Sequence, residues 1–249
     1  MVKVDEDDKD IGNLTDIIGV DIGQTYAGGF YAWKVDPTWK LDSPHMVFNK
    51  AIKSSALRFG ERWYLGQMAK RKPDAIVRAE QNLRRMVNEQ WNDHFRRIKS
   101  LLTEISHFYN GEDMRKIGYI KRKADGALHA IATNKILRMV GLHIRTKVPD
   151  DRNIGIAMGR ANFGRKSSFE KHFITKVRSL GYKVFFVDEK YTSQKCPCCL
   201  RQCGSIGIRV KTCTRCGKWY HRETMAAQNI AVAGLCWSKG IERPRYLTE

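Results

Sequence analysis

The sequence predicts an α/β fold in which helices flank a mixed sheet and a small metal-binding module is inserted near the carboxyl end. Three observations lead to this prediction: an apolar hairpin pattern early in the chain, a strand–helix–strand pattern after residue 153, and four cysteines in two Cys-x2-Cys pairs. The 249 residues, with 42% apolar content, are enough for one large domain or for a domain plus a small module.

The first part of the chain is typical of a β-meander. Two strand patterns lie between Asp16 and Val35, separated by a turn at Gly23, and a third covers Met46 to Ile52. Short apolar segments bounded by glycine are characteristic of paired strands. The sequence therefore predicts three consecutive antiparallel strands.

A helical region follows the meander. From Ala75 to Phe108, apolar residues recur at steps of three and four, which predicts a helix whose apolar stripe packs in a core. Basic residues occupy its other faces. Asn110 interrupts the pattern, and Ala127 to Thr146 predicts a second helix. The stripe comprises Val87, Trp91, Phe95, Ile98, Leu102 and Ile105.

The remaining elements predict a parallel crossover. Asn153 to Met158 is a strand pattern, Ser167 to Leu180 is a helix pattern that stops at Gly181, and Tyr182 to Val187 is a buried strand pattern. Strands joined through one helix are expected to be parallel neighbours. A closing helix is expected from Glu223 to Leu235. This order of elements is that of an RNase H-like domain.

Four cysteines have the spacing of a zinc knuckle. Cys196 and Cys199 form one pair, and Cys213 and Cys216 form another after thirteen intervening residues. Each pair can bind one side of a tetrahedral Zn2+ ion. Cys203 could replace Cys199 as a ligand, but that would break the symmetric pairing. Such clustered thiols fit metal binding in a reducing compartment better than disulfides.

The charge predicts a polyanionic partner. The formal net charge is +19, with 45 Lys and Arg against 26 acids, and nucleic acid is the partner that such an excess favours. The alternative is a basic protein with solvated charged faces. No apolar segment has the length of a membrane span, and the polar, acidic first ten residues predict no secretory leader. We expect an intracellular protein, nuclear in a eukaryote and cytoplasmic otherwise.

Basic and aromatic residues alternate within the cysteine-rich segment. Such a mixture suits contact with a nucleic-acid backbone and its bases, and ordinary packing of Trp219 is the alternative. His221 follows the last cysteine by five residues, and because four thiolates already complete a tetrahedral site, we expect it to support the zinc site or to contact phosphate. The basic residues are Arg209, Lys211, Arg215 and Lys218.

Three acids lie where strands end or a helix begins. Asp21 ends the first strand, Glu189 follows a buried strand, and Glu223 begins the last helix. Hydrolysis of a phosphodiester by two metal ions needs carboxylates gathered in this way. If Val187 faces one side of the strand, Glu189 faces the same side and Asp188 the other, and we choose Glu189 because its longer side chain can reach Asp21. Each acid also has a structural alternative. Asp21 could be hydrogen-bonded to the turn that follows it, and Glu189 could belong to a solvated acidic turn. Glu223 could stabilise the helix dipole as an acid in the first turn.

Four motifs together resemble a known family: the RuvC-like nuclease of transposon-encoded TnpB proteins, their eukaryotic Fanzor relatives and type V CRISPR effectors. The resemblance covers roughly residues 16 to 236. The matching motifs are Gly19-Val-Asp21-Ile-Gly23, Thr192-Ser-Gln-Lys-Cys196-Pro-Cys-Cys199, Cys213-Thr-Arg-Cys216-Gly217 and Ala226-Ala-Gln-Asn-Ile230.

The resemblance implies a RuvC-like domain that cleaves DNA with Mg2+ or Mn2+ under the direction of a guide RNA. Asp21 matches the first catalytic Asp of the family. Gly159 stands where the usual second acid lies, and Glu189 matches the acid that Fanzor-like members carry instead. Glu223 replaces the third Asp, and Met225 replaces an Asn.

The resulting prediction divides the chain into four parts. They are an acidic N-terminus (1–15), a nuclease core (16–190) with a helical insertion at about 73–148, a zinc ribbon (191–220), and a final helix with the tail (221–249). We expect a metal-dependent DNA endonuclease with Asp21, Glu189 and Glu223 at its centre. The alternative is a nuclease-dead, zinc-containing, repressor-like nucleic-acid-binding protein. The resemblance also implies an N-terminal guide-binding half. We expect either that the chain is a fragment or that guide binding is reduced, lost or supplied by a partner protein.

Overall fold

The computed structural model describes residues 13–22, 26–35, 48–53, 59–141, 147–160, 168–207 and 209–248. The chain forms two compact units. The first comprises Met1–Ala56 and His129–Glu249, and the second comprises Leu57–Leu128. The compact helical unit thus starts and ends earlier in the chain than the helical insertion predicted at about 73–148.

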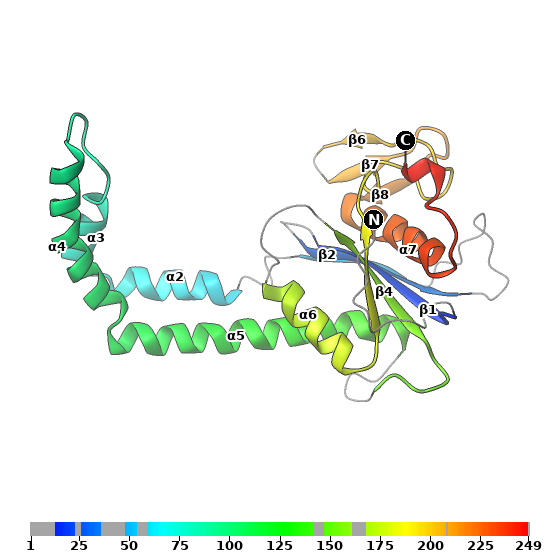
Figure 1. Cartoon of the computed structure of the whole chain (residues 1–249), viewed down its shortest axis with the longest axis horizontal. Coiled ribbons are helices and arrows are strands. Elements are labelled where there is room, and N and C mark those ends of the chain that lie inside the picture. The colour runs from blue at the N-terminus through cyan, green and yellow to red at the C-terminus, as the bar shows by residue number, and fades with distance from the viewer. Residues whose placement is uncertain are drawn as a thin grey trace. The chain divides into compact units, whose positions relative to one another are not determined.

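The first unit is built on a five-stranded mixed sheet (Figure 1). The strand order is β3-β2-β1-β4-β5, with β1 antiparallel to β2, β2 antiparallel to β3, β1 parallel to β4, and β4 parallel to β5. The parallel pairing of β4 with β5 confirms the predicted crossover. The strands are β1 (Asp16–Asp21), β2 (Tyr26–Lys34), β3 (Phe48–Lys53), β4 (Ile154–Arg160) and β5 (Lys183–Asp188).

Some predicted boundaries lie outside the described residues. The turn expected at Gly23 and the strand start expected at Met46 both belong to this group. The same holds for the predicted helix end at Thr146 and for Ser167, where the crossover helix was expected to begin.

Two helices cover the two faces of the five-stranded sheet. Helix α6 (Ser168–Ser179) packs on one face, where Phe173 meets Phe30 with ring centroids 6.2 Å apart. Helix α7 (Arg222–Ser238) packs on the other face, as Figure 1 shows. Gly181 follows α6 with φ of +89°, a left-handed conformation that glycine adopts without strain, and so ends the helix as predicted.

Helix α7 lies unusually close to the sheet because glycines face it. A Cβ atom on Gly19 would lie 2.7 Å from the backbone nitrogen of Ala231, and one on Gly29 would lie 2.7 Å from that of Thr224. Gly234 of α7 itself has no room for a Cβ, which would lie 2.5 Å from the Cβ of Ala157. Only hydrogen side chains permit this separation.

A small second sheet belongs to the same unit. It contains β6 (Gly204–Ile206), β7 (Val210–Thr212) and β8 (Trp219–His221), all antiparallel, and β8 leads directly into α7. Together with the four cysteines, these short strands form the expected ribbon. A final 3-10 turn, η2 (Arg245–Leu247), buries Leu247 against the core that Ile17, Phe185 and α7 share.

The second unit is helical, and here one prediction was wrong. The helix predicted from Ala75 to Phe108 is divided into two, with residues 82–90 between them. Asn88 in that connection has φ of +65°, which a right-handed helix excludes. The helix predicted from Ala127 begins earlier, at Glu112. The elements are α2 (Phe59–Arg71), α3 (Asp74–Gln81), α4 (Trp91–Tyr109) and α5 (Glu112–Leu137), and α5 continues into the first unit before η1 (Arg138–Val140).

The apolar stripe of this region is not a core, which corrects a second prediction. Val87 is 91% exposed, Trp91 is 58% exposed and Phe95 is 57% exposed, whereas Ile98 and Ile105 are half-buried. The helical periodicity over α4 is confirmed, but burial depends on a second packed layer that the sequence does not reveal. None of the described helices is apolar over a length that could cross a bilayer.

The close packing of α7 gives a stability prediction. Gly19→Ala should destabilise the first unit by about 3 kcal/mol, because the methyl group would collide with the backbone of α7. Gly126→Ala is the matched control: it lies inside α5 with nothing within 4 Å of a new Cβ, so it should stabilise by about 0.5–1 kcal/mol. Denaturant unfolding measures both, and equal midpoints for the two variants would contradict the packing described.

Candidate functional site

Four cysteine sulfurs converge in the ribbon. The Sγ atoms of Cys196, Cys199, Cys213 and Cys216 all lie within 4.8 Å of one another, and no disulfide joins them. Sγ of Cys196 is 3.7 Å from that of Cys216, and Sγ of Cys199 is 3.2 Å from that of Cys213. A tetrahedron with Zn–S bonds of about 2.3 Å has edges of about 3.8 Å, so these sulfurs fit a Zn2+ ion.

The two halves of this cysteine cage repeat one backbone turn. In the first, the N–H of Leu200 donates to the carbonyl of Cys196 at 2.9 Å, and in the second, the N–H of Gly217 donates to the carbonyl of Cys213 at 2.8 Å. The residue after each pair is left-handed, with φ of +63° at Leu200 and +68° at Gly217. The Cys-x2-Cys spacing thus produces two equivalent knuckles that present their sulfurs to the same point.

Position separates the four candidate ligands from Cys203. Among the described residues, the Sγ atoms that gather within 4.8 Å of one another belong to the two predicted pairs, and Cys203 is not among them. Within the cage, backbone N–H groups, first that of Cys216, lower the pKa of Cys213 to about 6, which favours the thiolate that a metal needs.

Asp21 lies at the carboxyl end of β1 and faces α7. It is the register partner of Gly29, and paired residues in a sheet share a face. Gly29 faces the first turn of α7, where a Cβ would meet the backbone of Glu223 and Thr224. The side chain of Asp21 and the start of α7 are thus at the same edge and on the same side of the sheet.

Glu189 lies on this side as well, above Gly159. A Cβ on Gly159 would lie 2.6 Å from Cγ of Glu189, so the Glu189 side chain fills the space that a side chain at position 159 would occupy. Gly159 is next to Met158, which pairs with Val20 of β1, so Glu189 lies near Asp21. Asp188 is exposed and accepts a hydrogen bond from the N–H of Lys190 at 2.9 Å.

The turn that carries Glu189 is held by three side chains. Thr192 donates through its hydroxyl to the carbonyl of Glu189 at 2.8 Å. Asn229 of α7 is fully buried and donates to the carbonyls of Thr192 and Lys195, both at 2.8 Å. Arg243 donates to the carbonyl of Asp188 at 2.8 Å and to that of the residue two positions later at 2.7 Å.

The roles of these supporting residues were not predicted from the sequence. The motifs that contain Thr192 and Asn229 marked the family resemblance, and the structure brings the two residues into direct contact. No sequence signal identified Arg243. Its role depends on a contact with a segment more than fifty residues away.

Glu223 is buried at the start of α7 and has basic neighbours. Its Oε1 forms an ion pair with Arg209, and its Oε2 lies 3.0 Å from Nδ1 of His221. Burial and the nearby Arg209 lower the pKa of His221, which favours a neutral ring. Arg209 comes from the ribbon, where the sequence suggested a contact with phosphate. It links the ribbon to the candidate site.

The three acids lie at one end of the sheet, but their carboxylate oxygens do not converge on a single point. Burial, and then the charge of Glu189, raise the pKa of Asp21 to about 7. Burial raises the pKa of Glu189 as well. Among the described residues, only the cysteines bring three or more ligand atoms within 4.8 Å of one another. The carboxylate of Glu223 is directed toward Arg209 and His221. Two carboxylates with raised pKa values would favour a divalent cation between them.

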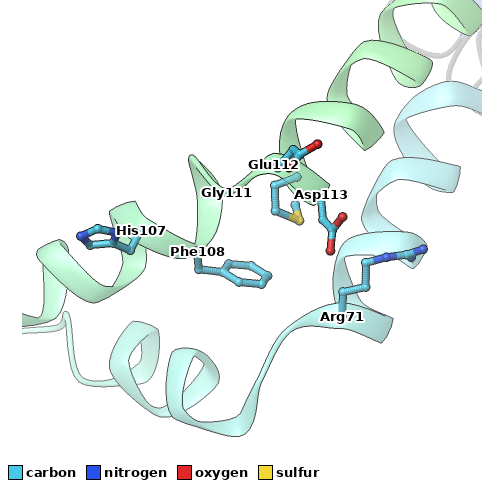
Figure 2. A pocket seen from close by; sticks show the side chains of 7 residues that line it. Arg71, His107, Phe108, Gly111, Glu112 and Asp113 are labelled. Atoms are coloured by element: carbon cyan, nitrogen blue, oxygen red, sulfur yellow. The ribbon is translucent and has the colours of Figure 1, made fainter.

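A cavity of about 390 Å3 lies in the helical unit (Figure 2). None of the predicted site residues lines it. Its walls come from the ends of three helices, with Arg71 of α2, His107 and Phe108 of α4, and Glu112 and Asp113 at the start of α5.

Zinc binding provides a test of the cage. Cys199→Ala should lower zinc affinity by at least about 100-fold and destabilise the ribbon, because one of four ligands is removed. Cys203→Ala is the matched control and should retain one zinc per chain. Zinc content after competition with a chromophoric chelator measures both. Loss of zinc in the Cys203 variant with retention in the Cys199 variant would overturn the assignment.

Asn229 provides a test of the support beneath Glu189. Asn229→Asp preserves the shape but removes both N–H donors, so it should destabilise the first unit by about 3 kcal/mol. Gln228→Glu makes the same chemical change at the half-buried neighbouring position and should cost less than about 1 kcal/mol. Denaturant unfolding compares the two, and similar losses would contradict the structural role of Asn229.

Comparison with known protein families finds a match to part of the chain. Residues 167–230, which contain α6, β5, the ribbon and the first half of α7, match the family described as Cas12f1-like, TNB domain. The match includes all four cage cysteines, Glu189 and Glu223. No curated protein matches the chain.

Solved structures with a similar fold come from larger proteins. A cryo-EM structure of CasPhi-2 (Cas12j) bound to crRNA and phosphorothioate-DNA has a TM-score of 0.51 at 12% identity, over 92% of this chain and 46% of that one. CasPhi-2 bound to crRNA has a TM-score of 0.48 at 12% identity, over 96% of this chain and 50% of that one. The mini-RNA-guided endonuclease CRISPR-Cas_phi3 has a TM-score of 0.47 at 14% identity, over 88% of this chain and 45% of that one.

This chain thus spans about half the length of the solved structures that it matches. At 12% identity the likeness to CasPhi-2 shows a shared fold, and the family match adds the ribbon and the two segments that flank it. The family match shows that residues 167–230 are similar to the Cas12f1-like TNB domain, and the likeness to CasPhi-2 shows a shared fold over 92% of the chain. Both findings agree with the resemblance to TnpB proteins and type V CRISPR effectors that the sequence motifs indicate.

Proposed function

We propose that the first unit is an RNase H-like, RuvC-type domain that hydrolyses DNA with the help of Mg2+ or Mn2+, in the manner of Fanzor and TnpB nucleases. One observation carries the proposal. Glu189 fills the space above Gly159, on the same side and at the same end of the sheet as Asp21. A carboxylate is therefore supplied from the end of β5 at the place where a side chain from β4 would otherwise begin.

The chemistry follows from where the acids lie. Asp21 and Glu189 would hold divalent ions, which activate a water and stabilise the leaving oxygen when they are bound. Because the Thr192 and Asn229 bonds fix the turn at Glu189, the backbone that carries its carboxylate is held in place before a metal binds. This arrangement reduces the reorganisation that metal binding requires.

Glu223 would be the third ligand, and Arg209 competes for it. The guanidinium neutralises the Glu223 carboxylate, so a cation that binds there must share or displace it. An arginine at this position can instead contact a phosphate of the substrate once the ion is bound. Either arrangement connects the ribbon to cleavage.

The proposed substrate and guide come from charge and from relatives. The net charge of +19 favours a nucleic-acid ligand, and the CasPhi-2 structure of similar fold contains crRNA and phosphorothioate-DNA. Since this chain spans about half of that protein, we propose that a further segment or partner completes guide binding. Zn2+ in the cage would be structural, because four thiolates leave no open coordination position.

Replacing Glu189 tests the proposal. Glu189→Gln should lower the rate of metal-dependent DNA cleavage by more than about 100-fold, because a neutral amide oxygen binds Mg2+ much more weakly than a carboxylate does. Binding of DNA without Mg2+ or Mn2+ should change less than about twofold. Asp188→Asn is the matched control, since Asp188 is exposed next to Glu189, and it should retain cleavage.

A second variant moves the carboxylate from position 189 to position 159. Glu189→Ala combined with Gly159→Glu should recover part of the cleavage that Glu189→Ala loses, because both positions lead to the same space. Full cleavage by Glu189→Gln would remove this residue from the site. Absence of cleavage by the unmodified chain on single- and double-stranded DNA, with Mg2+ or Mn2+, would favour the alternative of a nuclease-dead binding protein.

A further inference from the structure

We propose that the helical unit carries a binding platform for single-stranded nucleic acid, formed by Arg85, Trp91 and Phe95. The rings of Trp91 and Phe95 are stacked on one face of α4, with centroids 5.7 Å apart and planes 28° from parallel. The guanidinium of Arg85 lies over the Trp91 ring, 4.7 Å from its centroid. We call these three side chains the stacking platform.

The stacking platform is exposed where a core would have been expected. Trp91 and Phe95 each retain more than half of their accessible surface, and Met86 and Val87 beside them are exposed too. Exposed aromatic rings next to arginine are unfavourable for a helix that contacts only water, and they are typical of a surface that binds a planar ligand. The bases of an unpaired strand provide such planes whatever their sequence, because every base has a π face.

A network of bonds holds the stacking platform in place. Arg97 forms a two-pronged ion pair with Glu89, with N–O distances of 2.8 and 2.9 Å, and donates to the backbone carbonyls of Asn82 and Arg84. The carbonyl of Glu89 accepts a bond from Arg85 at 3.1 Å. These contacts fix the 82–90 connection against α4 and position the guanidinium of Arg85 over the Trp91 ring.

The charge around the stacking platform selects the occupant. Residues 82–99 contain five Arg and Lys but two acids, and these acids pair with Arg97 and Arg96. The segment therefore keeps a positive excess around the rings, which suits a phosphate backbone. Bases within a duplex are stacked on one another and cannot reach an aromatic side chain, so the geometry selects an unpaired strand. A second copy of this chain would bring the same positive charge and be repelled.

The inference rests on the proposed function only in taking nucleic acid as the ligand. Its test uses the full chain without added Mg2+ or Mn2+, so that binding is measured apart from cleavage. Fluorescence anisotropy of a labelled oligothymidine strand and of a duplex of equal length gives the two affinities. A catalytically inactive chain can pass this test, and an active nuclease can fail it, so the two proposals are separable.

The expected result is a selective loss of single-strand affinity. Trp91→Ala should weaken binding of the single strand by about tenfold or more and that of the duplex by less than about twofold. Arg85→Gln should weaken single-strand binding and reduce the slope of log affinity against log salt by about 0.7, the value for one phosphate contact. Leu65→Ala and Lys116→Gln are matched controls, because both are exposed in the same unit outside the stacking platform, and both should bind nearly as the parent does.

Three outcomes would overturn the inference. These are equal losses for single strand and duplex in Trp91→Ala, unchanged binding in that variant, and losses in Leu65→Ala as large as those in Trp91→Ala. A concentration-dependent dimer that Trp91→Ala dissociates, with strand binding intact, would assign the surface to self-association instead. Circular dichroism of each variant, compared with the parent, shows whether the helices remain folded, and a Trp91→Phe variant that keeps the single-strand affinity would support stacking over any loss of structure.

Discussion

The structure depends on how closely helix α7 lies against the central sheet. Gly19 and Gly29 of the sheet and Gly234 of the helix have no side chains to separate the two layers. A larger residue at any of these positions would move α7 outward by a distance that the core must fill. The start of the helix would move with it, and Glu223 would move away from the edge of the sheet where β1 ends at Asp21. The geometry of the candidate site therefore rests on three glycines.

The cysteine cage connects the two segments that bring acids to this site. Glu189 lies seven residues before Cys196, and Glu223 lies seven residues after Cys216. A zinc ion bound by the four thiolates would fix both ends of the ribbon and limit how far the acids can separate. Arg209 adds a direct contact from the ribbon to Glu223. The metal cage can thus organise the site without taking part in its chemistry.

The helical unit follows a different principle. In the first unit, apolar residues such as Ile17 and Phe185 are buried between a sheet and a helix. In the second, Trp91 and Phe95 lie on a helix face that the described part of the chain leaves exposed, and polar bonds between Glu89 and Arg97 provide the local rigidity. This organisation suits a surface that must remain open until a partner covers it.

The sequence by itself determined the features that depend on near neighbours along the chain. The alternation and spacing predicted the strands, the crossover and the pairing of cysteines, because these follow from local geometry and ligand chemistry. The tertiary structure decided what depends on distant contacts. It placed Glu189 over Gly159, joined Asn229 to the Thr192 turn, and left the stripe of α4 exposed. Periodicity shows that a helix has two faces, but only the packed layers decide which of them is covered.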